Sequence, residues 1–177
     1  FGGDAKYGIT SSRTADLTVN TDFAQVEEDL QQVNLTRFSL QFPEKRDFFI
    51  EGQGIFDFGG VQAGNSPGDV PLMFYSRRIG LSQGQAVPVV GGARLTGRQG
   101  PYSIGFLDIH TEESEEAAAP ASAFTALRLK RNVLRRSNVG VMATRRGPAA
   151  VSTPANRGSG DASYTFGADA TLLFFKS

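Results

Sequence analysis

The chain has 177 residues, and its 18 Lys and Arg balance 18 Asp and Glu, so the formal net charge is zero. That balance provides no bulk attraction to nucleic acid, and the absence of cysteine excludes disulfides, thiolate metal sites and a cysteine nucleophile. Abundant glycine (21) and phenylalanine (14) favour β structure. No apolar run reaches about 18 residues, so no transmembrane helix is predicted.

The first predicted element is a hairpin over residues 5–20, because AKYGIT and ADLTVN both alternate apolar and polar residues around the short turn SSRT. Residues 22–33 (DFAQVEEDLQQV) have apolar residues at helical spacing, and the pattern fits either a short helix or an irregular strand. Further strands are predicted at 32–41, 71–79, 87–98, 101–110, 122–133 and 137–146, with long loops at 51–70, 111–121 and 147–161.

The last predicted strand, residues 162–175, has the clearest alternation. Its two faces consist of Tyr164, Phe166, Ala168, Ala170, Leu172 and Phe174 on one side, and Ser163, Thr165, Gly167, Asp169 and Thr171 on the other. The pattern extends over about a dozen residues, whereas a soluble strand usually has about 5–6. We expect the apolar face of this strand to meet lipid and Asp169 to point the opposite way.

Long strands, short turns at one end and long polar loops at the other are typical of a transmembrane β-barrel. The predicted fold class is therefore all-β and antiparallel, with residues 1–177 as a single β domain that forms part or all of an outer-membrane barrel. We expect this chain to be a fragment of a longer protein. A soluble antiparallel sandwich also has alternating strands and stays open as an alternative.

Four stretches carry a resemblance to a known family: GGDAKYGIT (2–10), LTVNTDFAQVEEDLQQVNLTRFSLQFPEKRDFFIEGQGIFDFG (17–59), FYSRRIG (74–80) and VPVVGGARLTGR (87–98). In these the chain resembles a bacterial family of uncharacterised outer-membrane proteins with a family-9-like carbohydrate-binding domain before a barrel-like region. The resemblance implies a location in the outer membrane of a Gram-negative-type bacterium. It also implies that carbohydrate contacts belong to the upstream domain and to no residue of this chain.

The segment FPEKRDFFIEG (42–52) mixes aromatic and charged residues. We predict an ordered segment at the rim or mouth of the barrel, with Phe42, Phe48 and Phe49 as aromatic anchors. At least one of Lys45 and Arg46 should then lie within salt-bridge reach of a carboxylate, for which Glu51 is a candidate. The alternative interpretation is a solvated charged turn.

Two further sets of charged residues are candidate sites. Arg77, Arg94 and Arg128 lie in different predicted strands and would form a basic lumen for anionic solutes if their side chains face inward. Alternation cannot place every basic residue inside, since neighbours such as Arg77 and Arg78 point to opposite faces. Oxygen ligands for a hard cation are available at Asp22, Glu27, Glu28 and Asp29, although their spacing matches no EF-hand loop.

Nothing in the sequence predicts catalysis. His110 is the single histidine, and no nucleophile elbow or metal-binding histidine pair is present. We expect no enzyme activity and no cofactor. The predicted function is an outer-membrane channel, or an anchor for an external carbohydrate-binding module, with outer-membrane lipid and other envelope proteins as partners. A non-transporting scaffold subunit and a soluble binding module are the alternatives.

Overall fold

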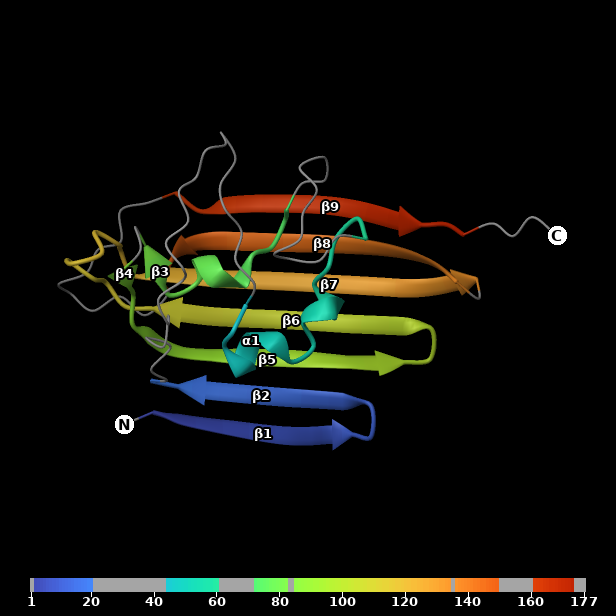
Figure 1. Ribbon diagram of the computed structural model, residues 1–177, viewed down its shortest axis with the longest axis horizontal. Helices are drawn as coiled ribbons and strands as arrows, with labels where there is room; N and C mark the ends of the chain where they lie inside the picture. Colours follow the sequence, from blue (N-terminus) through green and yellow to red (C-terminus); the bar gives the residue numbers. More distant parts are fainter. Residues whose placement is uncertain are drawn as a thin grey trace.

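The computed structural model describes residues 2–20, 44–60, 72–82, 85–134, 136–149 and 161–173. Its main element is a seven-stranded antiparallel sheet in the order β1-β2-β5-β6-β7-β8-β9 (Figure 1). The strands are β1 (Gly3–Thr10), β2 (Arg13–Val19), β5 (Val89–Gln99), β6 (Tyr102–Thr111), β7 (Ser122–Leu134), β8 (Ser137–Pro148) and β9 (Ser163–Thr171). The predicted all-β, antiparallel fold class is confirmed.

The sheet is a meander whose two ends differ. Short connections join β1 to β2, β5 to β6 and β7 to β8 at one end, which we name the turn end; longer connections lie at the opposite loop end (Figure 1). Strands β5 to β9 contain between 9 and 13 residues. That exceeds the usual length of about 5–6 residues and reaches or passes the ~9–11 residues that a tilted strand needs to cross a bilayer.

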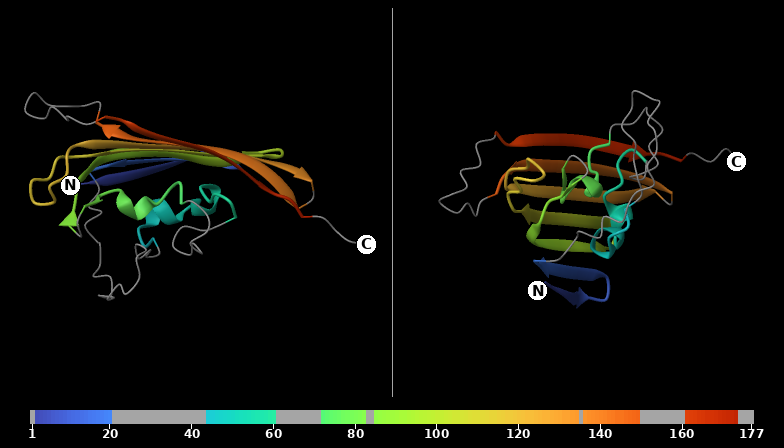
Figure 2. Two further views of the ribbon diagram at one scale, coloured as in Figure 1. Left: turned by 90° about the horizontal axis from the view of Figure 1, so that it is seen from above. Right: turned by 60° about the vertical axis from the view of Figure 1, so that its left-hand side comes forward.

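The connection between β2 and β5 carries the remaining elements. They are α1 (Asp47–Ile50), the 3-10 helices η1 (Gln53–Ile55) and η2 (Ser76–Arg78), and a small hairpin of β3 (Leu81–Ser82) and β4 (Gln85–Ala86). Seen along its edge, the sheet has α1, η1 and η2 all on the same side (Figure 2). We name that side of the sheet the covered face and the opposite side the open face.

The hydrophobic core lies between the covered face and these short helices. Its buried members are Phe49, Phe56, Ile79, Val89, Leu107, Ile109, Ala126 and Met142, with Phe48, Phe58, Met73, Phe74 and Phe124 packed around them. Glycines in the strands allow this close approach. A Cβ atom at Gly105 would lie 2.6 Å from Ile55 Cγ2, and one at Gly167 would lie 2.5 Å from Met73 Sδ. A side chain at either position would require the packed side chains of Ile55 and Phe56, or of Met73 and Phe58, to shift.

The predicted strand at 71–79 is wrong. Residues 72–75 belong to no strand, and Ser76–Arg78 form η2. The physical reason is that Met73 and Phe74 are apolar because they pack onto the hydrophobic core, not because they line one face of a sheet. A short apolar stretch has the same sequence pattern whether it forms a strand or packs as an irregular segment onto a core.

The sheet has two edges within the described residues. β1 and β9 are its outermost strands and lie on opposite sides (Figure 1). The described strands therefore form a long-stranded antiparallel sheet, and they do not close into the barrel that the sequence predicted. Among the described residues, no helix has the length and hydropathy required to cross a membrane. The predictions for 22–33 and 32–41, including the cation ligands Asp22, Glu27, Glu28 and Asp29, lie outside the described residues.

Candidate functional site: the two faces of the sheet

Residues paired directly across neighbouring antiparallel strands share a face, so the register defines rows of side chains that cross the sheet. One row on the open face takes a residue from each of the seven strands, and all seven are apolar. They are Tyr7, Ala15, Leu95, Phe106, Leu127, Ala143 and Phe166. None of the seven is buried. The open face thus presents a continuous apolar surface from one edge of the sheet to the other.

The same face has other exposed apolar side chains on both sides of this row. They are Leu17, Val19, Tyr102, Ile104, Leu129, Val139, Val141 and Tyr164, with exposed fractions between 36% and 63%. Tyr102 begins β6 at the turn end and Tyr164 lies near the loop end of β9, so tyrosines lie toward both ends of the surface. In the last strand, Tyr164, Phe166, Ala168 and Leu172 are exposed, and Asp169 lies on the covered face, where it pairs with Arg128. The predicted opposite orientation of Asp169 and the apolar residues is confirmed. Phe174 lies outside the described residues.

The covered face combines the apolar core residues with buried charged side chains. The row next to the apolar one begins with Lys6, Asp16 and Arg94 on β1, β2 and β5. A parallel row contains Arg128 of β7. Asp16, Arg94 and Arg128 are all buried beneath the connection between β2 and β5. Charged side chains buried in this way must be paired, because an unpaired buried charge costs several kcal/mol.

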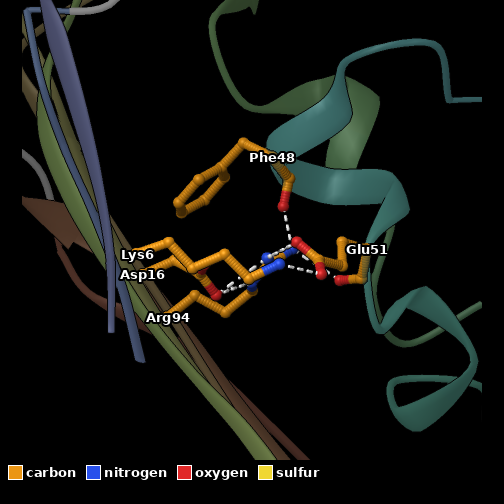
Figure 3. Close-up of polar contacts among 5 residues, drawn as sticks. All are labelled: Lys6, Asp16, Phe48, Glu51 and Arg94. Carbon is orange, nitrogen blue, oxygen red and sulfur yellow. Dashed lines mark hydrogen bonds and ion pairs between the residues drawn. The ribbon is translucent and has the colours of Figure 1, made fainter. Parts of the chain in front are cut away.

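Arg94 joins the sheet to α1 (Figure 3). Its Nη2 atom lies 2.8 Å from Asp16 Oδ2 and 3.2 Å from Glu51 Oε2, and its Nη1 atom donates hydrogen bonds to the carbonyl oxygens of Phe48 and Glu51. The guanidinium also lies over the Phe48 ring, 4.9 Å from the centroid. Glu51 forms a second ion pair with Lys6 of β1. This network attaches the C-terminal end of α1 to three neighbouring strands.

Arg128 and Asp169 form a bidentate pair between β7 and β9. Their two nitrogen–oxygen distances are 2.6 and 2.7 Å, and the side chains of both residues are at least 92% buried. Asp169 also accepts a hydrogen bond from the Gly59 backbone N–H, and the Arg128 guanidinium lies 5.4 Å from the Phe58 ring centroid. Lys130, next on the same face, donates to the Gly54 carbonyl. The segment 52–60 is thereby fixed over strands β7 to β9.

We name residues 44–60 and 72–80 of the connection between β2 and β5 the covering segment. Arg46 lies at its start and joins its two parts. Its guanidinium forms a bidentate pair with Glu44 at 2.8 Å and donates to the carbonyl oxygens of Ile79 and Ser76. Glu44 accepts a further hydrogen bond from the Ser76 hydroxyl at 2.6 Å, and the guanidinium lies 4.2 Å from the Phe49 ring centroid. These contacts connect the residues before α1 to η2, which is thirty residues later in the chain.

The carboxyl groups of the covering segment titrate differently from one another. Burial by itself would raise the pKa of Glu44, but the hydrogen bonds and charge of Arg46 outweigh it and keep that pKa below its ordinary value. The hydrogen bond from Lys6 likewise lowers the pKa of Glu51 below its ordinary value. Asp57 behaves in the opposite way, since burial raises its pKa more than Lys130 and Arg128 lower it. The segment therefore contains a buried carboxylate, Glu44, whose ionised form is favoured, and a half-buried one, Asp57, whose ionised form is disfavoured.

The segment that the sequence singled out is ordered and packed. Phe49 is 5% exposed, and Phe48 lies edge-on to it with ring centroids 5.2 Å apart. The predicted salt bridge of this segment is confirmed for Arg46, although its carboxylate is Glu44, while Glu51 pairs with Lys6 and Arg94. The solvated-turn interpretation is wrong for Glu44 and Arg46, whose side chains are 2% and 9% exposed. Phe42 lies outside the described residues.

The predicted lumen charges have separate environments. Arg94 and Arg128 both face the covered side, where each is matched by an acidic partner, so neither presents a free positive charge there. Arg77 is buried in η2, on no strand of the sheet. Lys45 is exposed. The structure therefore brings Arg94, Glu51 and Phe48 together, while Arg77 is part of η2 and Lys45 is at the surface.

Sequence reasoning missed the acidic partners Asp16 and Glu44 and the role of Lys6. Alternation does place Asp16 on the polar face of its predicted strand, so the side of the sheet could be foreseen. The pairing could not, because 78 residues separate Asp16 from Arg94 along the chain. Glu44 was visible only as one of four consecutive charges.

Comparison with known proteins gives one result. Residues 1–100 match the family described as domain of unknown function (DUF5916). The match covers more than half of the chain. This chain belongs to the DUF5916 family. The matched region includes β1, β2, the whole covering segment and β5, so the ion-pair network of Arg94 lies entirely within it. No curated protein and no solved structure matches the chain.

Proposed function

We propose that this chain forms part of the wall of a bacterial outer-membrane β-barrel and serves as a membrane anchor. In this proposal the open face contacts lipid and the covered face points inward. The observation that carries it is the apolar row that includes one residue from every strand of the sheet, all of them unburied. Barrels in membranes alternate in this sense, with apolar residues outward and polar residues inward.

The distribution of charge supports a bilayer rather than a second sheet as the cover of the open face. In a soluble sandwich the buried face is apolar and the solvated face is polar. Here the charged face already has its cover, with a hydrophobic core of its own, and the apolar face is the exposed one. An exposed apolar surface of this extent indicates contact with lipid or with another protein. Tyrosines at both ends fit the aromatic girdles that border a bilayer.

An anchor is favoured over an open channel because the covering segment occupies the inward side. Residues 48–58 contact the sheet through Arg94 and Arg128, while Arg46 joins residues 44–49 to residues 76–79. Each of these three guanidiniums has an acidic partner. An anion pathway would need basic side chains that are free to meet a solute. The proteins that this chain resembles carry an upstream carbohydrate-binding domain, and such a domain is what the anchor would hold at the membrane.

Lipid contact can be tested with two neighbouring residues of β9. Phe166 on the open face and Thr165 on the covered face are both exposed. Because the 177 residues contain no cysteine, Phe166→Cys and Thr165→Cys each give one spin-labelling position in this region. In vesicles, a label at 166 should collide with oxygen dissolved in the bilayer and be protected from a water-soluble nickel complex. The label at 165 should show the reverse. Equal nickel accessibility at both positions would contradict a lipid-facing surface.

Planar-bilayer recordings distinguish an anchor from a channel. The full-length protein should give no steady conductance, because the inward side is filled. A stable open conductance that persists with the covering segment intact would overturn the anchor interpretation in favour of a channel.

A further inference from the structure

Three arginines of the described strands lie on the open face: Arg13, Arg131 and Arg145. Two of them are at the turn end and have partners on that face. Arg13 donates a hydrogen bond to Gln99, and the Arg131 guanidinium lies 5.4 Å from the Tyr102 ring centroid. Arg145 is in the half of β8 nearer the loop end. Within the part of the chain described here, its guanidinium has no hydrogen bond, ion pair or ring contact.

Arg145 is half-buried as a residue, but none of its side-chain nitrogens is among the buried polar atoms without a hydrogen-bond partner, so an anion can still reach its guanidinium. The acidic residue in its row is Asp108, two strands away through Thr125, or about 10 Å at the usual strand spacing. The Asp108 carboxylate is already engaged: Thr125 Oγ1 donates to it at 2.6 Å, and His110 Nε2 lies 2.8 Å from it. Arg145 therefore retains an unsatisfied, planar set of donors.

The surroundings of Arg145 indicate where an anion would come from. The guanidinium extends along β8 toward the loop end, where its Nη2 atom lies 3.0 Å from the position that a Cβ atom of Gly147 would take. Tyr164 is its direct neighbour on β9 and stacks on Phe166 with ring centroids 6.4 Å apart. A cation directed along an apolar surface toward its polar border, beside aromatic side chains, has the position of an interfacial lipid contact.

We propose that Arg145 binds the phosphate group of a membrane lipid whose acyl chains lie along the open face beside Phe166. The chemical basis is that a guanidinium binds phosphate through two parallel hydrogen bonds, whereas the carboxylate in its row, Asp108, is already bonded to Thr125 and lies beside His110. This inference rests on the proposed function, because it places the open face in a bilayer.

The test uses the full-length protein in detergent, titrated with phosphatidic acid or with diacylglycerol of the same acyl chains and observed by native mass spectrometry. Arg145→Gln should weaken the binding of phosphatidic acid about fivefold, the usual effect of one basic residue at an anionic membrane surface. The binding of diacylglycerol should not change. Arg131→Gln removes an arginine from the turn end of the same face and is the matched control, with binding expected at the parent level.

Two outcomes would overturn the lipid site. One is equal binding of phosphatidic acid by the Arg145→Gln and Arg131→Gln variants. The other is competition by inorganic phosphate as strong as that by the phosphorylated lipid, which would mean that the acyl chains contribute nothing. Arg145→Lys keeps the charge but cannot form the two parallel hydrogen bonds, so its binding of phosphatidic acid should fall between that of the parent and that of Arg145→Gln. Binding by Arg145→Lys at the parent level would contradict the bidentate contact.

The spin label at residue 166 separates this inference from the proposed function. A label that contacts lipid, together with unchanged binding by Arg145→Gln, would remove only the phosphate site. A label at 166 that stays in water would remove the lipid-facing surface itself, and the phosphate site with it.

Discussion

The two faces of the sheet divide the residue types in opposite ways. On the covered face, Asp16, Arg94 and Arg128 are buried, while on the open face Leu127, Val141 and Phe166 are 49%, 53% and 74% exposed. A soluble sheet usually buries its apolar face and exposes its polar one. The covering segment is held by ion pairs as well as by apolar contacts, and the apolar face has no cover among the described residues.

The largest expected effect comes from the apolar part of the covered face. Changing both Phe48 and Phe49 to Ser should cost on the order of 5 kcal/mol in the docking of residues 44–60, since a single buried Phe→Ala change typically costs about 3–5 kcal/mol. Limited proteolysis in membranes should then cut near residue 50 much faster, with the strands intact. Ile50→Ser, on the exposed side of the same helix, is the control and should be cut at the parent rate. Equal rates for all three proteins would mean that the phenylalanines do not anchor the segment.

Breaking the buried ion pair should have the next largest effect. Arg128→Met leaves Asp169 buried without its cation, which should lower the free energy of unfolding by about 3–5 kcal/mol. Urea unfolding followed by circular dichroism measures this change. Replacing both residues, Arg128→Met with Asp169→Leu, should recover most of the loss because no charge is left unpaired. A single variant as stable as the double variant would show that the pair is more hydrated than its burial indicates.

A charge placed on the open face tests what covers it. Val141→Arg should reduce stability in lipid by about 2–4 kcal/mol if residue 141 lies near the bilayer midplane. The same change on a surface that faces water should stay within about 0.5 kcal/mol. Unfolding measured in vesicles, with Val141→Ala as the reference for lost apolar area, distinguishes the two cases.

Glu44→Gln should loosen the covering segment by about 1–3 kcal/mol at neutral pH, because Arg46 and the Ser76 hydroxyl lose a charged acceptor. The pKa of Glu44 is lowered in the folded protein, so the ionised carboxylate stabilises it above the ordinary value of 4.5. That contribution disappears as the pH falls through the lowered pKa. Hydrogen exchange of residues 44–50 should therefore differ between parent and variant at pH 7 and converge in acid. A constant difference at all pH values would exclude the carboxylate as its cause.

Asp57→Asn should have the smallest effect and the opposite sign. The pKa of Asp57 is raised by burial, so its ionised form costs stability above the folded pKa, and protonation relieves that cost as the pH falls. The variant should stabilise residues 52–60 by less than about 1 kcal/mol at neutral pH. Hydrogen exchange should show slower opening at pH 7 and no difference in acid. Faster opening at pH 7 would indicate that the attraction to Lys130 outweighs desolvation.

The sequence by itself determined the strands and their two faces. A period of two in residues 162–171 places Asp169 opposite Phe166, and this orientation follows from backbone geometry alone, whatever the rest of the chain does. The same reasoning gave the hairpin at 5–20 and the long strands after residue 87. It also identified residues 42–52 as a segment in which aromatic and charged side chains must both find partners.

Only the tertiary structure decided which partners these are and which face is covered. Arg46 contacts Ser76, thirty residues away, and Arg94 contacts Asp16, 78 residues away, because the chain folds back over the sheet between β2 and β5. The same return of the chain makes residues 72–80 a packed segment with a 3-10 helix where alternation predicted a strand. Local periodicity reports that a residue is apolar, but the choice among core, strand and lipid surface depends on contacts between segments distant in sequence.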